Sequence, residues 1–349
     1  MTEKIKVGII GFGKIGKIRK NVIDNNSNLV LEAVCDPIPQ TLDENIGCKF
    51  FRNYQDLLKL DIDAVFVCTP NKYTPDIVVS ALKNKKHVFC EKPPGRNIGD
   101  IQKIIAEERK NPNLKLKFGF NHRYHDNVLE AKSIIDSGRY GKVLWLRGVY
   151  GKSGGSNFKE LWRSQRKVAG GGILLDQGIH MIDLFRMFCN DFDEVKSFVS
   201  NSCWNLDVEN DAFAILRNKD GQLASIHSSS TQWKHTFSLE ISLEKGYINL
   251  YGILSSTRSY GQGEKLITAK RQFEEEAYSV GNPQENVIYF NEDKSWEREI
   301  DEFVDCIKNN KKVTIGNSYD ALKAMELVYK IYRADPKWFN KMKSYEKGD

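Results

Sequence analysis

A glycine cluster near the start of the printed sequence constrains the fold more than any other feature. Gly11, Gly13 and Gly16 stand at the spacing G-x-G-x-x-G, directly after an apolar run at residues 5–10. This pattern predicts a buried strand, a tight turn and a helix that runs to about residue 24. In a dinucleotide-binding unit the first glycine permits the turn, the second lets the backbone approach the pyrophosphate, and the third lets the helix pack on the strand. The helix N-terminus then offers N–H groups to the phosphates.

Asp36 extends this pattern toward a choice of cofactor. It ends a second predicted strand at residues 29–35 and lies twenty residues beyond Gly16. A carboxylate in this place accepts hydrogen bonds from the adenosine ribose and repels the 2′-phosphate of NADP. Pro37, Ile38 and Pro39 follow and supply no arginine to offset that repulsion, so the sequence favours NAD over NADP. The alternative is an aspartate that merely opens a turn before Pro37.

Strand-like and helical runs alternate through the first third of the chain. Strands are predicted at residues 64–68, 87–90 and 114–120, with helices at 75–83 and 98–109. This alternation predicts an α/β doubly wound parallel sheet, in which ligands lie off the carboxyl ends of the strands. Thr69-Pro70-Asn71 and Glu91-Lys92-Pro93 then lie on the cofactor side. Two interpretations of Lys92 remain open: a lysine held in the site beside prolines, or half of a solvated charge pair in a turn.

The remaining two thirds of the chain show a different pattern. A chain of 349 residues predicts about two domains, here a Rossmann-type domain at 1–121 and an α+β domain at 122–349. Alternating segments and turn signals predict a mainly antiparallel, open-faced sheet in the second domain. Its strands are expected at 143–150, 212–217, 223–229, 265–268 and 287–290, and its helices at 128–137, 295–309 and 319–333. The last helix is free to pack back toward the first domain.

A polar stretch at 151–169 is expected to be a long loop, and Gly170-Gly171-Gly172 then opens a helix at 173–188. Asp176 and His180 stand four residues apart, which places them one turn apart on one helical face, and Asp183 follows three residues later. A carboxylate that orients an imidazole is an acid–base unit. The alternative is an exposed helical ion pair.

Composition narrows the range of partners. The net charge is +6, but basic and acidic residues alternate, which favours a solvated surface over a nucleic-acid patch. No apolar run is long enough for a membrane span, and no secretion signal is evident. The seven cysteines include no C-x-x-C pair, which favours reduced thiols over disulfides or zinc. We therefore expect a cytoplasmic protein with no nucleic-acid, membrane or metal partner.

With these motifs in hand, the chain resembles the Gfo/Idh/MocA family (glucose–fructose oxidoreductase, inositol dehydrogenase, MocA) of NAD(P)-dependent sugar and polyol oxidoreductases. The resemblance covers nearly the whole chain. The matching pieces are GFGKIG at 11–16, CTPN at 68–71, CEKP at 90–93, Arg123, WRSQRKVAGGGILLDQGIHMIDLF at 162–185 and the closing segment YDALKAMELVYKIY. One departure is Thr74, because the family often has histidine three residues after the asparagine of its TPN motif. This departure concerns the details of the cofactor loop and leaves the matches at Lys92, Asp176 and His180 untouched.

The resemblance implies roles for particular residues. Lys92 would lie beside the nicotinamide and polarise the reacting hydroxyl or carbonyl, with Asp176 orienting and His180 exchanging the proton. The implied cofactor contacts are Gly11, Phe12, Gly13, Lys14, Ile15, Gly16, Asp36, Thr69, Pro70, Asn71, Glu91 and Lys92. The implied substrate contacts are Arg123, Tyr150, Lys152, Trp162, Arg163 and Asp183. For Asp183 a structural carboxylate is an equal alternative.

The function implied is an NAD-dependent dehydrogenase. It would oxidise a secondary alcohol of a sugar, cyclitol or nucleotide-sugar, or reduce the matching ketone. Two alternatives are an NAD-dependent glycosidase that oxidises transiently and a non-catalytic NAD-sensing regulator, although Lys92, Asp176 and His180 argue against the regulator. The resemblance also implies a homodimer or homotetramer formed through the open face of the second sheet.

Overall fold

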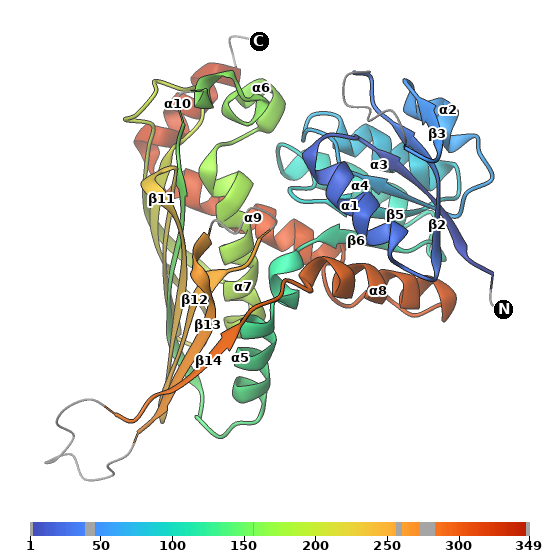
Figure 1. Cartoon of the computed structure of the whole chain (residues 1–349). Coiled ribbons are helices and arrows are strands. Elements are labelled where there is room, and N and C mark those ends of the chain that lie inside the picture. The colour runs from blue at the N-terminus through green and yellow to red at the C-terminus, as the bar shows by residue number, and fades with distance from the viewer. Residues whose placement is uncertain (1–2, 39–45, 156, 256–259, 272–282, 347–349) are drawn as a thin grey trace, which may run out of the picture. The chain divides into compact units, whose positions relative to one another are not determined.

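The computed structural model describes residues 3–38, 46–155, 157–255, 260–271 and 283–346 (Figure 1). The chain divides into two compact units. Unit 1 contains residues 1–121, 167–170 and 296–325, and unit 2 contains residues 122–166, 171–295 and 326–349. Unit 1 therefore takes in two segments from beyond residue 121.

Unit 1 is built on a six-stranded sheet with the strand order β3-β2-β1-β4-β5-β6, and all the pairings are parallel. Its strands are β1 (Ile5–Ile10), β2 (Leu29–Cys35), β3 (Lys49–Phe51), β4 (Ala64–Val67), β5 (His87–Glu91) and β6 (Leu116–Gly119). Its helices are α1 (Lys14–Asp24), α2 (Tyr54–Leu58), α3 (Thr74–Lys83), α4 (Ile98–Glu108), α8 (Ser295–Lys308) and the start of α9 (Ser318–Ala334). The predicted doubly wound sheet is confirmed, and β3 and α2 are elements that the sequence pattern did not predict.

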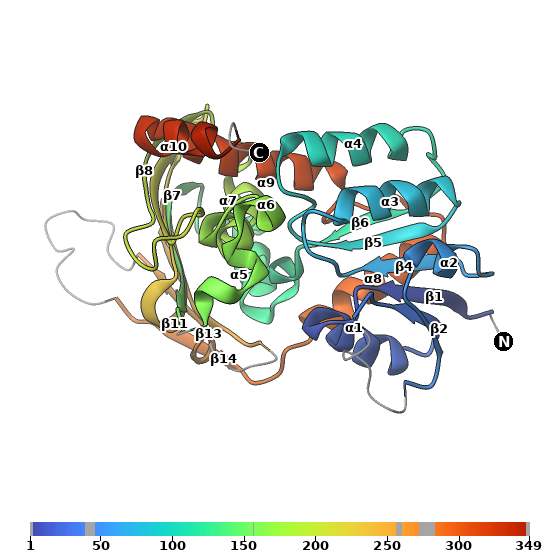
Figure 2. The same ribbon diagram turned by 90° about the horizontal axis from the view of Figure 1, so that it is seen from above.

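Helices cover both faces of this sheet, with α3 and α4 on one side and α1 and α8 on the other (Figure 2). Burial on both faces explains why the strands read as continuous apolar runs. Phe66 and Phe89 stack on neighbouring strands with their ring centroids 5.2 Å apart. Phe303 of α8 meets both rings edge-on, at 6.0 and 5.6 Å. A helix near the end of the chain therefore completes the core of the N-terminal sheet.

Unit 2 is built on an eight-stranded sheet with the order β14-β13-β12-β11-β7-β10-β9-β8. All the pairings are antiparallel except that of β10 with β7. The strands are β7 (Val143–Ser153), β8 (Glu194–Ser200), β9 (Asp211–Arg217), β10 (Leu223–Ser229), β11 (Thr231–Leu243), β12 (Gly246–Ile253), β13 (Tyr260–Lys270) and β14 (Asn286–Phe290). Its α-helices are α5 (Asp126–Asp136), α7 (Ile179–Cys189), α10 (Pro336–Glu346) and the rest of α9, and η5 (Leu174–Gly178) is a π-helix. The 3₁₀ turns are η2 (Asn121–Tyr124), η3 (Phe158–Glu160) and η4 (Trp162–Ser164), and the short helix α6 (Arg166–Ala169) belongs to unit 1 from residue 167.

The two faces of the second sheet differ in chemistry. Figure 1 shows α5 and α7 against one face. Gly148 of β7 lets α7 approach there, because a Cβ at this position would lie 2.6 Å from the Met181 sulfur. Residues that point the other way leave large apolar side chains in solvent, among them Phe198, Phe213 and Ile215. The predicted mainly antiparallel, open-faced sheet is confirmed.

Three local expectations were wrong. The stretch 151–169 is not one long loop, because β7 continues to Ser153 and η3, η4 and α6 follow. The predicted helix at 173–188 begins as a π-helix, η5, and turns into α7 at Ile179. A further helix, α10, closes the chain after α9. In the described part of the chain, every helix is too short or too polar to cross a membrane.

Candidate active site

The glycine loop of unit 1 has the geometry that a pyrophosphate requires. Gly11 has φ +93°, and a Cβ there would lie 2.5 Å from the carbonyl oxygen of Cys68. A Cβ on Gly16 would lie 2.2 Å from the carbonyl oxygen of Gly11, so the helix can start this close to the turn only with glycine. Gly13 caps α1 without a side-chain hydrogen bond and has open space where a Cβ would be. The open N-terminus of α1 therefore fits a dinucleotide phosphate.

Asp36 follows β2 at the same sheet edge and is buried. Its Oδ2 accepts a hydrogen bond from the Phe12 amide at 2.8 Å, and its Oδ1 accepts one from the Ile38 amide at 2.9 Å. The carboxylate therefore ties the glycine loop to the end of β2. Pro39 lies outside the described residues.

The segment after β4 holds residues 167–170 within unit 1. Asn71 is buried and donates its side-chain amide to the carbonyl oxygen of Ala169 at 2.7 Å. The hydroxyl groups of Thr69 and Thr74 lie 3.0 Å apart. Thr74 therefore stabilises the turn that follows β4, in the position where the family often has histidine.

Glu91, the last residue of β5, is bound by a buried arginine that the sequence pattern did not single out. Arg19 of α1 has no exposed surface, and its Nε donates to Glu91 at 2.7 Å while its Nη2 donates to Glu299 of α8 at 2.8 Å. Its guanidinium lies between the rings of Phe89 and Trp296. The buried charge cluster of Arg19, Glu91 and Glu299 therefore fixes the end of β5, directly before Lys92. Lys92 itself is half-buried.

This cluster predicts a pH-dependent stability. Burial raises the pKa of Glu299 from 4.5 to about 7, against the opposing charges of Arg19 and Lys117. The effect of burial on this pKa exceeds that of the charges because Arg19 divides its guanidinium between Glu299 and Glu91. Between pH 4.5 and about 7 the folded carboxyl keeps a proton that the unfolded one has lost, so stability falls as the pH rises through this window.

Glu299→Gln removes this titration. The wild type should therefore lose stability relative to the variant as the pH rises from 4.5 to 8. The difference in free energy of unfolding, variant minus wild type, should increase by at most about 3 kcal/mol over this range. Urea unfolding at both pH values measures the shift. Glu297→Gln, at an exposed position of the same helix, is the matched control. An equal difference from wild type at both pH values would contradict the prediction.

In unit 2, Asp176 lies in the π-helix η5, and His180 follows at the start of α7. Asp176 Oδ1 accepts from Arg163 Nε at 3.4 Å, and its Oδ2 accepts from the Gln177 side chain at 3.2 Å. Burial raises the pKa of Tyr150 well above its usual value, with the charge of Asp176 among the contributing causes.

His180 lies in the first turn of α7 and is 4% exposed. Its ring stacks on that of His122 with centroids 3.7 Å apart and planes 13° apart. His122 Nε2 lies 2.9 Å from the hydroxyl of Tyr150. The imidazole of His180 is thus held by a second imidazole, whose own orientation is fixed by a tyrosine on β7.

Close packing in unit 2 explains the last glycine of the triplet at 170–172. A Cβ on Gly172 would lie 1.9 Å from the carbonyl oxygen of Glu209. The buried Glu209 carboxylate accepts hydrogen bonds from the amides of Gly172 and Leu174 and from the Tyr332 hydroxyl. Burial raises the pKa of Glu209. This carboxylate therefore fixes the start of η5, and sequence analysis did not find it.

The predicted substrate residues fall into two groups. Arg123 forms a buried, two-pronged pair with Asp183, at 2.6 and 2.5 Å. Tyr150 is 2% exposed and lies on the sheet face that carries α7. Lys152 and Arg163 instead line a small cavity beside Asp176, of about 10 Å³, which is space for about one water. Arg163 also lies over the ring of Trp162, at 4.3 Å.

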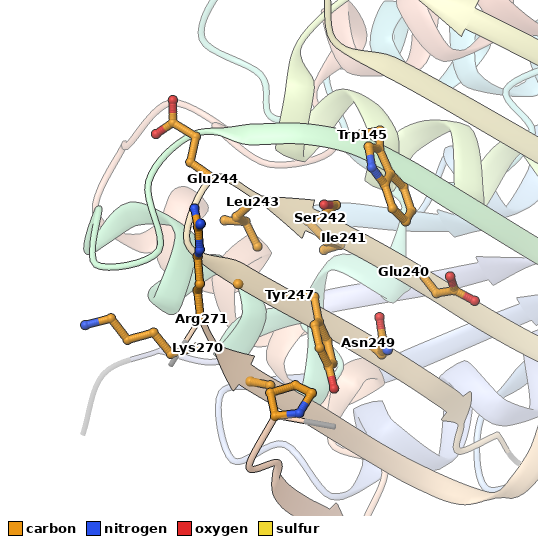
Figure 3. A pocket seen from close by; sticks show the side chains of 13 residues that line it. Trp145, Glu240, Ile241, Ser242, Leu243, Glu244, Tyr247, Asn249, Lys270 and Arg271 are labelled. Carbon is orange, nitrogen blue, oxygen red and sulfur yellow. The ribbon is translucent and has the colours of Figure 1, made fainter. Parts of the chain in front are cut away.

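A larger groove, of about 450 Å³, lies on the outward face of the second sheet. Figure 3 shows Trp145, Glu240, Tyr247 and Asn249 around it. Strands β7, β11, β12 and β13 supply its walls, and none of the predicted cofactor, catalytic or substrate residues lines it. Of the predicted site residues, Lys92 and the glycine loop belong to unit 1, and Asp176 and His180 belong to unit 2.

Comparison with protein families matches both units. Residues 5–120 match a family model described as an oxidoreductase family with an NAD-binding Rossmann fold. Residues 128–249 match a model described as a GFO/IDH/MocA C-terminal domain. Unit 1 is thus an NAD-binding Rossmann domain, in agreement with the glycine loop geometry.

Individual relatives agree with these matches. The myo-inositol 2-dehydrogenase of Thermotoga maritima is 30% identical over 237 residues, which span 64% of this chain and 68% of that protein. The inositol 2-dehydrogenase of Salmonella typhimurium is 35% identical over 151 residues, 41% of this chain and 45% of its own length. A solved levoglucosan dehydrogenase, in complex with NADH and L-sorbose, matches with a TM-score of 0.84 at 20% identity and covers 96% of this chain and 97% of its own. That structure establishes a shared fold.

Proposed function

Because the chain belongs to the Gfo/Idh/MocA family of oxidoreductases, we propose that it oxidises a secondary alcohol of a sugar, cyclitol or nucleotide-sugar, or reduces the matching ketone, with NAD. The observation that carries this proposal is the buried imidazole of His180 beside the η5 turn, in a chain that also keeps the lysine after β5. A purely sensory role would not require an imidazole that is buried and held by a second ring. The printed names of the relatives, inositol and levoglucosan dehydrogenases, support the class of substrate.

The proposed mechanism divides the work among three side chains. Bound NAD supplies the acceptor for the hydride. Lys92 donates a hydrogen bond to the reacting oxygen and stabilises the negative charge that develops there. His180 takes the proton of the hydroxyl group, because an imidazole exchanges protons near neutral pH. Asp176 orients the imidazole and the substrate.

The test is a screen of free sugars, inositols and UDP-sugars for NAD reduction, followed at 340 nm. A steady rise in NADH absorbance supports a dehydrogenase. Cleavage of a glycoside with no net NADH would instead identify the glycosidase alternative. NAD binding without turnover of any compound in either direction would favour the regulator.

Cofactor choice gives a separate prediction. NAD should be used with a kcat/KM at least roughly tenfold above that for NADP, because Asp36 repels a 2′-phosphate without a neighbouring cation to relieve it. Asp36→Ala should shrink this ratio. Since Asp36 also accepts the Phe12 amide, Asp36→Asn is the cleaner control: it removes the charge and keeps an acceptor. Equal use of both cofactors by the wild type would contradict the assignment.

We further propose that the molecule is a homodimer or homotetramer assembled through the outward face of the second sheet. The exposed Phe198, Phe213 and Ile215 on β8 and β9 support this, because a contiguous apolar patch of this kind is typical of a protein contact. Sedimentation velocity measures the state directly, and a monomer at all concentrations would overturn it.

A further inference from the structure

We propose that the substrate carries a second ring beyond the one that is oxidised, and that this ring stacks on an aromatic platform formed by Phe158, Trp204 and Trp233. The inference rests on the proposed function and narrows its substrate class to two-ring compounds. It concerns unit 2 alone.

The platform is assembled from three segments that are far apart in the sequence. Phe158 lies in η3, Trp204 lies between β8 and β9, and Trp233 lies on β11. The ring centroids of Phe158 and Trp204 are 4.9 Å apart, and those of Trp204 and Trp233 are 5.9 Å apart. Trp233 is nevertheless 67% exposed. Rings that only filled a core would not leave the outermost indole in solvent.

One end of the platform and the predicted catalytic carboxylate line the same small cavity. Phe158 lines the small cavity that Asp176, Lys152 and Arg163 also line. The row of rings then leads outward through Trp204 to Trp233. We place the substituent of a sugar held near Asp176 on this row.

The backbone is strained to present these rings. Trp204, Asn205 and Trp233 have φ values of +61°, +49° and +57°, in the left-handed region that bulky side chains rarely adopt. The pairing of β11 with β7 also shifts register between Thr231 and Thr236, and such bulges re-aim side chains. A Cβ on Gly154 would lie 2.1 Å from the Trp204 ring, so this glycine makes room for the indole. Strain of this kind gathers at ligand sites.

The chemistry of the platform suits a ring that bears polar groups. An aromatic face is electron-rich and attracts the C–H face of a sugar or the face of a nucleobase. Lys159 and Lys234, both exposed, directly follow Phe158 and Trp233 in the chain. Their ammonium groups suit hydroxyl or phosphate oxygens better than the apolar surface of a protein partner. The second ring is therefore a sugar, as in a glycoside, or a base, as in a nucleotide-sugar.

The experiment compares one-ring with two-ring substrates. We would measure kcat/KM with NAD for glucose and myo-inositol, for maltose and cellobiose, and for UDP-glucose, in wild type and Trp233→Ala. The wild type should prefer a two-ring compound, and Trp233→Ala should lower that kcat/KM roughly tenfold or more while the one-ring values stay the same. The preferred two-ring compound then distinguishes a sugar from a base.

Two further variants serve as controls. Trp233→Phe keeps an aromatic face and should restore much of the preference. Trp145→Ala removes the other largely exposed tryptophan of the described residues, which stands at the opposite end of the same pair of strands, and should leave the preference unchanged. No preference in the wild type, equal losses for one-ring and two-ring compounds, or a change of oligomeric state in Trp233→Ala would overturn the platform.

Binding separates this proposal from the proposed function. Calorimetry of the NADH-loaded protein with the same compounds does not require turnover. If two-ring compounds bind in a Trp233-dependent way and none is oxidised, the platform is supported and the proposed oxidation fails. If one-ring sugars are oxidised and Trp233→Ala alters neither binding nor kinetics, the proposed function is supported and the platform is overturned.

Discussion

Replacing His180 by alanine is expected to lower kcat by about 10²- to 10⁴-fold, which is the usual contribution of a positioned acid–base group. Oxidation of an alcohol releases a proton from the oxygen, and the imidazole is the group that we propose accepts it. Steady-state kinetics with the best sugar from the screen measures the loss. NAD affinity should change little, because the glycine loop and Asp36 lie in unit 1.

The structure requires a control for stability in this experiment. His180 is buried and stacked on His122, so the alanine variant loses packing as well as a base. His227 provides a matched stack, with its ring 3.8 Å from that of Phe213 and 14° from parallel, on the outward face of the same sheet. His227→Ala removes an imidazole with the same stacking geometry from a more exposed pair, and it should leave kcat unchanged. A folded His180→Ala enzyme with wild-type kcat would show that Lys92 or a water accepts the proton.

Lys92→Met is expected to remove most turnover while NAD still binds. The ammonium group is the one that we propose polarises the reacting oxygen, and methionine keeps the length and packing of the side chain without its charge. Calorimetry with NAD gives the affinity, and kcat from the same preparation gives the catalytic loss. Near wild-type kcat would return Lys92 to the alternative interpretation, a solvated charge at the end of a strand.

Lys86→Met is the matched control for this variant. Lys86 stands just before β5, at the end opposite to Lys92, and its ammonium group donates to the carbonyl oxygens of Leu60 and Ile62. Its loss should lower stability without affecting kcat. A similar loss of activity in both variants would mean that β5 tolerates no change of charge, and the role proposed for Lys92 would lose its support.

The sequence predicted most of unit 1 because its signals are local. The apolar run at 5–10, the glycine spacing and Asp36 each report on a few neighbouring residues, and the strands read as apolar because both sheet faces are covered. The second sheet was predicted from alternation and turn residues. The parallel pairing of β10 with β7 was not, because strand order depends on contacts between distant segments.

The parts of the site that were missed depend on long-range contacts. Glu299 lies 280 residues from its partner Arg19, so nothing near either residue signals the pair. The spacing of Gly16, Arg19 and Ile23 did contain a signal, because it puts a charge on the buried stripe of α1. The stack of His122 on His180 joins two helices distant in sequence. The π turn at Asp176 depends on Glu209, whose carboxylate binds the amides that begin it.

The membership of α8 in unit 1 has a consequence for how the protein is made on the ribosome. All six strands of the first sheet have been synthesised by residue 121, yet Phe303, which covers Phe66 and Phe89, and Glu299, which pairs with Arg19, come from residues 296–325. At about 5–20 residues per second, roughly 10–35 s of translation separate these segments. During that time the nascent sheet carries an uncovered aromatic face and a buried arginine without one of its two carboxylates. The NAD-binding unit therefore reaches its final form only after residues 296–325 have been translated.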